Sequence, residues 1–249
     1  MLAGCASPDA GPGSGPGSGS GGEPPLTWPA SGKPQLVASY LIAGGFLPYG
    51  WTLMEGPRLV VYSDGMAIAD SAKTLVLDPR ELSDLVHGLR GELKGFGRTA
   101  TSKESELIAD APATTLSVQA EDGTLTSVSA YALGEASGYD ERLLTARGRM
   151  DSLTRRVLAD GGPYKGEKVR LVAEARGTGD RPEGDWPAGV PLPPVVAAGQ
   201  ARKGEYTGAE AEAIAAKLPD TWRSGPWPLL RASDGKVYGV AWRYLLPDE

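Results

Sequence analysis

Several residue types that support common chemistries are scarce in this chain of 249 residues. It has one Cys, one His and no Asn. One Cys excludes an intramolecular disulfide and a Cys-rich zinc or iron–sulfur site, and one His excludes a centre built from several histidines of one chain. The lack of Asn excludes N-linked glycosylation. We therefore expect no metal and no cofactor.

Positive charge and long apolar runs are also limited. Lys and Arg number 25 against 31 Asp and Glu, so the formal net charge is −6 and the chain offers no broad positive field to nucleic acid. The longest mostly apolar stretch, 36–47, is much shorter than the roughly 20 residues that a membrane-spanning helix needs. The sequence predicts neither a nucleic-acid partner nor a membrane-spanning helix.

What is present begins with a short motif at the start of the chain. Leu2-Ala3-Gly4-Cys5 resembles the lipobox of bacterial lipoproteins, whose Cys carries a thioether-linked diacylglycerol. The resemblance implies that Cys5 is lipidated and that the membrane surface is one partner. An export signal also needs an apolar segment of about 7–15 residues before the cleavage site. Two interpretations remain: a native start upstream of Met1, which places the protein on the outer face of the cytoplasmic membrane, or an accidental match without an export signal.

The segment after Cys5 has the composition of a linker. Residues 6–25 are rich in Gly, Ser and Pro and contain no large apolar side chain. A Gly-rich coil of this length has an r.m.s. end-to-end distance of about 25 Å, enough to hold a folded body clear of lipid headgroups. We therefore divide the chain into a truncated lipobox with a disordered tether, 1–25, and a folded body, 26–249.

Turn chemistry predicts the strands of the folded body. Three Asp-Gly pairs flanked by apolar runs indicate β-hairpins, because Gly accepts the positive φ of a tight turn. The hairpins pair 58–62 with 66–69, 114–120 with 124–131, and 228–232 with 236–244. Further strands are expected at 35–42, 74–77 and 168–174. Several of these strands alternate apolar and polar residues, so one face of the sheet is expected to contact solvent.

Capping signals and apolar spacing predict the helices. The run Asp78-Pro79-Arg80-Glu81 predicts a capped helix that ends near Lys94. Apolar spacing predicts a second helix over about 140–159, and a capping box that begins at Thr207 predicts a third. We therefore predict an α+β fold of mostly antiparallel hairpins with about three helices.

An internal repeat is one interpretation of this order. Lobes 26–174 and 186–249 each contain a Trp-Pro pair, a helix and a hairpin. The alternative is that helix-plus-hairpin units are simply common in α+β folds. The Gly- and Pro-rich segment 175–206 that joins the lobes is expected to be a linker or a covering loop.

Motifs that could carry catalysis are weak. His87 lies on the first predicted helix without a nucleophile motif, so we interpret it as a helix-surface residue. Ser233 and Lys236 have the spacing of penicillin-recognising enzymes, but they lie in a predicted hairpin turn. The acids within 180–185 are too few for a calcium loop. We predict no catalytic residue.

Aromatic side chains with polar groups are the remaining signal. The chain has six Trp and nine Tyr against two Phe. Such rings are favoured where one edge contacts water. The candidate ligand or partner surface consists of Trp222, Trp227, Tyr238, Trp242 and Tyr244. The alternative is that these rings are packed in the core.

The composition and two strand motifs suggest a family. Residues 58–65, RLVVYSDG, and 128–135, VSAYALGE, together with the lipobox-like start and the tether, resemble surface lipoproteins of high-GC actinobacteria that have no assigned function. The resemblance implies a location and no reaction. Our first hypothesis is a non-catalytic, lipid-anchored module that binds an unidentified protein or cell-wall partner. The alternatives are an extracytoplasmic hydrolase that uses carboxylates or Ser, and a structural or inhibitory protein.

Overall fold

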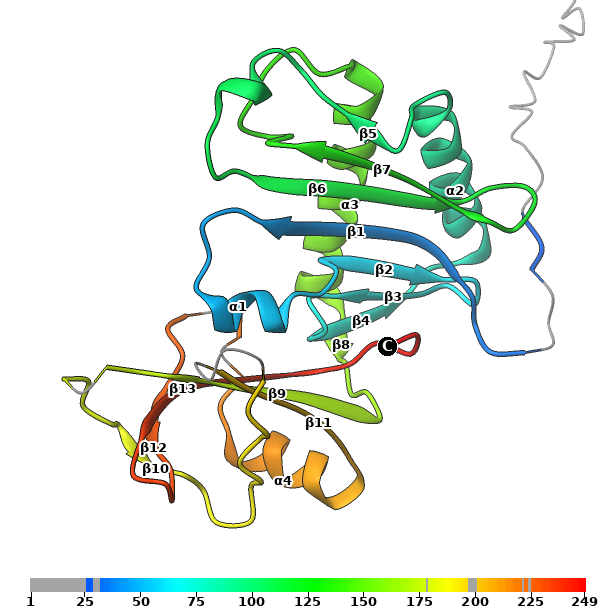
Figure 1. Ribbon diagram of the computed structural model, residues 1–249. Helices are drawn as coiled ribbons and strands as arrows, with labels where there is room; N and C mark the ends of the chain where they lie inside the picture. Colours follow the sequence, from blue (N-terminus) through cyan, green and yellow to red (C-terminus); the bar gives the residue numbers. More distant parts are fainter. Residues whose placement is uncertain (1–25, 29–31, 178, 197–200, 221, 224) are drawn as a thin grey trace, which may run out of the picture.

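The computed structural model describes residues 26–28, 32–177, 179–196, 201–220, 222–223 and 225–249 (Figure 1). Cys5 and the predicted tether lie outside the described residues. Within the described part, four α-helices and two mostly antiparallel sheets confirm the predicted α+β class. None of the described helices combines the length and apolar character that crossing a bilayer requires.

The first sheet has eight strands. Their spatial order is β5 (Thr99–Ala100), β7 (Leu125–Tyr131), β6 (Pro112–Gln119), β1 (Leu36–Gly44), β2 (Leu59–Tyr62), β3 (Met66–Ala69), β4 (Lys73–Val76) and β8 (Gly162–Pro163). All neighbours are antiparallel except β5 and β7. The β2–β3 and β6–β7 pairs confirm two of the predicted Asp-Gly hairpins.

Two helices cover one face of this sheet and enclose its core. They are α2 (Pro79–Leu93) and α3 (Glu141–Asp160), which lie side by side in Figure 1. Asp78 caps α2 as predicted, since its carboxylate accepts from the amides of Arg80 and Glu81 at 2.9 and 2.8 Å. The apolar faces of both helices are buried against the sheet, with Leu89 and Met150 fully buried. This core follows from the periodicity of the sequence.

The start of the described chain is attached to the same part of the molecule. The amide of Leu26 donates to Ser83 Oγ on α2 at 2.8 Å. The indole of Trp28 donates to Gln119 Oε1 on β6 at 2.9 Å. The predicted beginning of the folded body near residue 26 is thus docked on both layers of the first unit.

The second sheet has five strands. Their order is β10 (Gly184–Asp185), β12 (Leu229–Arg231), β13 (Val237–Tyr244), β9 (Lys168–Ala175) and β11 (Ala201–Thr207), and α4 (Gly208–Lys217) packs on one face. The β12–β13 pair confirms the third Asp-Gly hairpin.

Three details of this second unit differ from the sequence predictions. The strand over 168–174, placed in the first lobe, pairs with β11 and β13 and so belongs to the second sheet. The segment 175–206, expected to be a linker or loop, contributes strands β10 and β11. Thr207 ends β11, and its side chain does not cap α4. The first two differences arise because these strands are fixed by pairing with strands distant in the sequence, which local sequence patterns do not encode.

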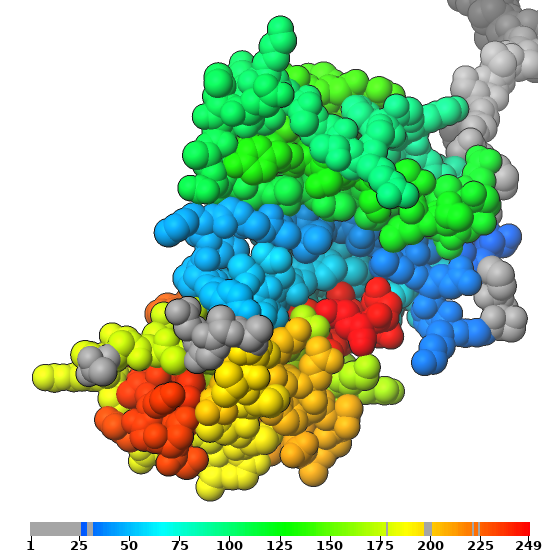
Figure 2. Space-filling view, in the orientation of Figure 1, coloured from blue at the N-terminus to red at the C-terminus, as the bar shows by residue number. Residues whose placement is uncertain are grey.

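A short helix and the C-terminal segment join the two sheets. Helix α1 (Tyr49–Met54), which the sequence did not indicate, lies between them in Figure 1 and contacts β9, β11 and β13. The amide of Gly50 donates to Glu174 Oε1 at 3.0 Å. In Figure 2 the C-terminal residues lie at the same junction, where Leu246 packs with Tyr62 and Tyr164. A single-turn 3₁₀ helix, η1 (Ser105–Leu107), completes the first unit.

Candidate functional site: a cleft between the two sheets

The aromatic surface predicted from the sequence is not exposed. Trp222, Trp227, Tyr238 and Trp242 are each at most 5% exposed, and Tyr244 is half-buried. These rings therefore do not form an exposed platform and follow the alternative of buried packing, although Trp222 also lines the smaller cleft described below. The physical reason is that β13 is covered on both faces, by α4 on one side and by α1 on the other, whereas the sequence pattern suggested one face in solvent.

The other sequence candidates remain apart from one another. His87 is half-buried on α2, and Ser233 lies in the β12–β13 turn. Within the described ranges, no group of three or more His, Cys, Asp and Glu side chains is placed to hold a metal ion. The candidate lipidation residue Cys5 lies outside these ranges.

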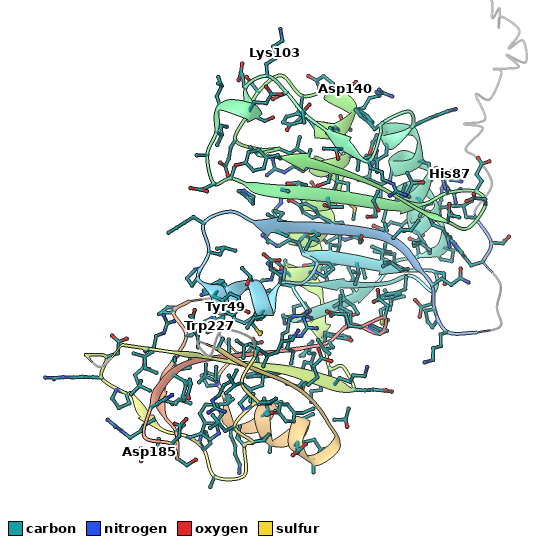
Figure 3. All side chains as sticks on the ribbon, in the orientation of Figure 1. Tyr49, His87, Lys103, Asp140, Asp185 and Trp227 are labelled. Carbon is teal, nitrogen blue, oxygen red and sulfur yellow. The ribbon has the colours of Figure 1, made fainter. Side chains whose placement is uncertain are left out.

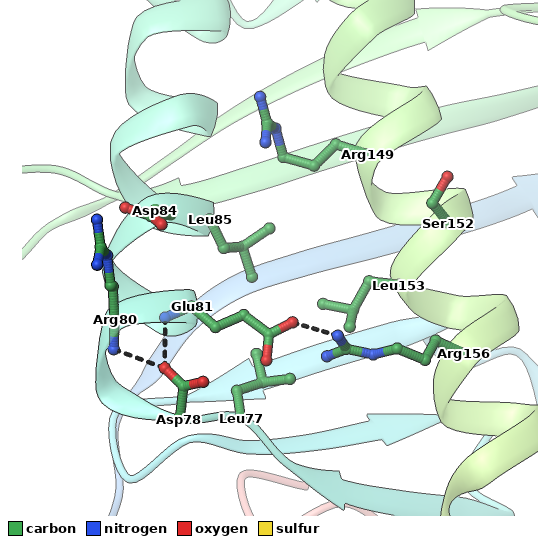
Figure 4. A pocket seen from close by; sticks show the side chains of 10 residues that line it. All are labelled: Leu77, Asp78, Arg80, Glu81, Asp84, Leu85, Arg149, Ser152, Leu153 and Arg156. Atoms are coloured by element: carbon green, nitrogen blue, oxygen red, sulfur yellow. Dashed lines mark hydrogen bonds and ion pairs between the residues drawn. The ribbon is translucent and has the colours of Figure 1, made fainter. Parts of the chain in front are cut away.

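A groove of about 570 Å³ lies between α2 and α3 (Figure 4). Leu85 and Leu153 form part of its floor, and an ion pair between Glu81 and Arg156 crosses it. Arg149, at its edge, pairs with Glu92 at 2.5 Å. Two arginines of α3 are thus paired with acids of α2, and the groove presents no excess charge that would select a ligand.

A smaller cleft, of about 270 Å³, lies where α1 and the strand ends of the first sheet meet the second unit. It is lined by Ile42, Leu47, Trp51, Glu55, Gly56, Arg58, Asp70, Trp222 and Arg223. These residues come from five separate segments of the chain. Ligand sites are typically concave and mostly apolar with a few convergent polar groups, and this cleft has that composition, with a volume just below the usual range.

A strained turn forms one wall of the cleft. Asp70 and Ser71 connect β3 to β4 with φ values of +51° and +56°, and the amide of Ala72 donates to the carbonyl of Ala69 at 2.9 Å. Two positive φ values define a type I′ turn, which normally carries Asn or Asp followed by Gly. Ser at the second position costs on the order of 1–3 kcal/mol, and such strain persists where the surroundings enforce it.

Two guanidinium groups enforce the conformation of Asp70. The Nε atoms of Arg58 and Arg223 each lie 2.9 Å from Asp70 Oδ1, as ion pairs rather than aligned hydrogen bonds. Arg223 also donates to the carbonyl of Gly56 at 2.8 Å and stacks over the ring of Trp222 at 4.0 Å. One carboxylate oxygen therefore faces two cations inside the cleft.

The charge of Asp70 offsets only part of the cost of removing the Arg223 guanidinium from water. Desolvation lowers the pKa of this guanidinium to about 10. The neighbouring cations Arg58 and Arg243 lower the pKa further. Arg223 is still charged at neutral pH, and an additional anion near it would be electrostatically favourable.

A second arginine network fixes the floor of the cleft. Arg243 is 1% exposed and donates to the carbonyls of Met54 and Glu55, each at 3.0 Å. Its terminal nitrogens bind both carboxylate oxygens of Glu249, at 2.6 and 2.7 Å. A Cβ at Gly56 would lie only 2.9 Å from Arg243 Cζ, so glycine is required for this close approach. The network binds α1 to β13 and to the C-terminal segment.

Apolar side chains form an exposed rim beside the cleft. Phe46 is 90%, Leu47 43% and Tyr49 40% exposed. Below this rim, Trp51 stacks on Trp227 with ring centroids 5.5 Å apart. Figure 3 shows Tyr49 and Trp227 at the junction of the two sheets. An exposed apolar rim next to a charged cleft is typical of a binding surface.

The sequence did not indicate this cleft, although it carried weak signals of it. The cleft joins Asp70 to Arg223, which are far apart in the chain, so no local pattern brings them together. One usable signal was Arg243 within an otherwise apolar strand, since a buried Arg needs several acceptors. Another was the Asp70-Ser71 pair between two strands, where turn chemistry favours Gly.

Comparison with protein-family models, with curated proteins and with solved structures finds no match to this chain. Its function is therefore inferred from the cleft and from the sequence motifs.

Proposed function

We propose that this chain is a non-catalytic binding module of the bacterial cell surface, anchored by lipid at Cys5, that binds its ligand or partner in the cleft between the two sheets. The cleft carries the binding role, because two guanidinium groups and two tryptophans converge there on the strained Asp70–Ser71 turn. Strain and buried charge reduce stability, and they cluster where binding or catalysis uses them.

The carboxylates of the cleft support binding over hydrolysis. Glu55 and Asp70 both line it, as a hydrolase built on two carboxylates would require. Glu55 Oε1, however, accepts a hydrogen bond from the amide of Gly44 at 3.0 Å, and Asp70 contacts two arginines. A catalytic carboxyl must be able to reach the substrate, whereas these two carboxylates are held by groups of the protein itself. Both side chains instead hold the walls of the cleft.

The anchor is supported by the motif Leu2-Ala3-Gly4-Cys5 and by the Gly- and Ser-rich segment that follows it. A diacylglycerol supplies two acyl chains, and stable membrane attachment takes two such anchors rather than one. A single Cys is also the composition expected of a surface protein without disulfides, since additional thiols would be exposed to oxidation.

Lipid labelling in the native cell tests the anchor. We expect an alkyne fatty acid to label the full-length protein and the protein to partition with membranes. Cys5→Ser is expected to abolish the label and release the protein. A mature surface protein with a free Cys5 thiol contradicts the anchor and leaves the cleft untouched.

Hydrogen exchange tests the cleft. With a small-molecule extract of the native cells, we expect slowed exchange confined to 42–58, 69–72 and the backbone next to Trp222. Leu47→Arg fills the cleft and should abolish the protection, whereas Leu144→Arg should not. Leu144 is a matched control because it is 40% exposed, close to the 43% of Leu47, but lies on α3. Wild-type protein with no protection at the cleft contradicts the proposed binding role.

A further inference from the structure

The charges around the cleft leave one cationic edge available. Asp70 Oδ1 is shared by Arg58 and Arg223, so one negative charge faces two positive ones. The second acid of the cleft, Glu55, is directed to the amide of Gly44. Two cations therefore face one anion directly. The formal charges of the four ionised side chains that line the cleft nevertheless sum to zero, because Glu55 is the second anion.

Arg58 and Arg223 differ in how many of their guanidinium nitrogens contact an acceptor in the protein. Arg223 uses a terminal nitrogen on the carbonyl of Gly56 and its Nε on Asp70. Arg58 uses its Nε on Asp70, and its terminal nitrogens have no acceptor among the described residues. The Arg58 side chain is also 35% exposed, against 25% for Arg223. The free, accessible edge of the cleft therefore belongs to Arg58.

The neighbouring arginine does not compete for a ligand. Arg243 is fully committed to backbone carbonyls and to both oxygens of Glu249, and it is buried. Its charge nevertheless adds to the positive potential at Arg223, which lowers the pKa of that group. A ligand anion at Arg58 would be attracted by the whole set of cations and would contact one of them.

Apolar side chains make up much of the rest of the lining. Ile42, Leu47 and Trp51 line the cleft, and the exposed side chain of Phe46 continues the surface outward. A volume of about 270 Å³ admits one small ring or branched side chain rather than an extended ligand. The ligand must therefore combine one anionic group with one apolar group at short distance.

We propose that the cleft binds a carboxylate adjacent to an aromatic or branched apolar group, with the carboxylate on the terminal nitrogens of Arg58 and the apolar group against Ile42, Leu47 and Trp51. The two parallel N–H groups of a guanidinium edge match the two oxygens of a carboxylate. Such an edge also fits a phosphate, but a phosphate dianion would bring a second negative charge into a cleft whose ionised lining residues sum to zero, so the single charge of a carboxylate is the better match. The inference rests on the proposed binding role of the cleft and specifies its ligand class, which a free acid or the C-terminus of a peptide could supply.

Titration of the full chain with 3-phenylpropionate tests the inference, with quenching of Trp fluorescence as the signal and 3-phenylpropionamide as the uncharged control. We expect saturable binding of the acid, at least tenfold weaker binding of the amide, and weaker binding at higher salt because the contact is ionic. A peptide that ends in a free Phe carboxylate, compared with its C-terminal amide, distinguishes a peptide end from a free acid as the natural source.

Variants of Arg58 locate the contact. Arg58→Gln should weaken binding of the acid at least tenfold and leave binding of the amide unchanged. Arg58→Lys retains the charge without the two-nitrogen edge and should bind with intermediate affinity. Arg142→Gln, on the surface of α3, should bind as wild type does. Circular dichroism and the amide titration show whether each variant is folded.

The outcomes separate this inference from the proposed function. Equal binding of acid and amide, or phenyl phosphate binding tighter than the carboxylate, overturns the carboxylate assignment. If native extract protects the cleft while the acid does not bind, the ligand class is wrong and the binding role stands. If neither the extract nor the acid affects the cleft, both proposals fail.

Discussion

The eight-stranded sheet and the junction between the two sheets are stabilised in different ways. In the first, α2 and α3 bury an apolar face whose residues recur at helical spacing, and the interior contains Leu, Val and Ala. At the junction, Arg243 and Asp70 are buried and Arg223 is half-buried, close to tryptophans. In the core of the eight-stranded sheet, replacing one apolar side chain by another of similar volume should cost little stability. The junction instead depends on a few polar contacts with defined geometry. The cleft lies at the junction.

The largest expected effect comes from removing the buried arginine of the junction. Arg243→Ala should lower the free energy of unfolding by about 3–5 kcal/mol, because it leaves buried carbonyls and the carboxylate of Glu249 without their donor. Urea denaturation measures the change. Leu89→Ala in the sheet core should cost about 2–5 kcal/mol by creating a cavity, without altering Trp51 fluorescence. A loss below 1 kcal/mol for Arg243→Ala would remove the distinction between the two regions.

A smaller effect is expected where α1 packs on the second sheet. A Cβ at Gly50 would lie 2.9 Å from the Trp227 ring and 3.0 Å from Glu174 Cβ. Gly50→Ala should therefore destabilise by about 1–3 kcal/mol through overpacking.

The control for this substitution lies in the first unit. Gly148 is inside α3, and a Cβ there meets nothing within 4 Å. Gly148→Ala should stabilise by roughly 0.5–1 kcal/mol through reduced unfolded-state entropy and better helix propensity. Thermal unfolding measures both variants, and equal effects would show that the close approach at Gly50 is not required.

The junction should also be the more acid-sensitive region. Burial raises the pKa of Glu249, but hydrogen bonds and charge from Arg243 outweigh it and hold the pKa below its ordinary value. A carboxyl whose folded pKa is depressed stabilises the fold above its unfolded pKa, and this contribution disappears as pH falls through the folded pKa. Unfolding between about pH 5 and 2 should therefore be less steep in Glu249→Gln. An unchanged slope would assign the acid sensitivity to other carboxylates.

The smallest effect is expected at the surface of the first unit. The ion pair between Arg156 and Glu81 joins α3 to α2, and both side chains are more than a third exposed. Arg156→Ala should cost about 0.2–1 kcal/mol and less in high salt, because solvent and ions screen such pairs. Denaturation at two salt concentrations measures this. A loss as large as that of Arg243→Ala would mean that exposure does not set the strength of ion pairs in this protein.

Elements that a few adjacent residues determine could be predicted from the sequence, whereas elements that depend on distant contacts could not. The Asp64-Gly65 hairpin and the helix capped by Asp78 were predicted because a few adjacent residues determine each of them. Helix α1 was missed because it has six residues and no side-chain cap. Strand β11 was missed because it is largely polar and owes its structure to pairing with β9.

The cleft was unpredictable for a related reason. Its residues come from segments that only the packing of the second sheet on α1 brings together. The tryptophans near the C-terminus stood out in the sequence, but the choice between an exposed platform and buried packing depended on α1, which covers one face of β13. Local rules thus specified the hairpins and the two long helices of the first unit and strands β9, β12 and β13 of the second, and the long-range contacts at the junction specified the cleft.

The docking of Leu26 and Trp28 has a mechanical consequence. A pulling force applied to the chain before residue 26 is transmitted to Ser83 on α2 and to Gln119 on β6. These attachment points belong to the eight-stranded unit, so they carry the tension before it can reach the junction. If the chain is anchored through residues before 26, as proposed, the load on that anchor enters the molecule at the eight-stranded unit and not at Arg58 or Asp70 of the cleft.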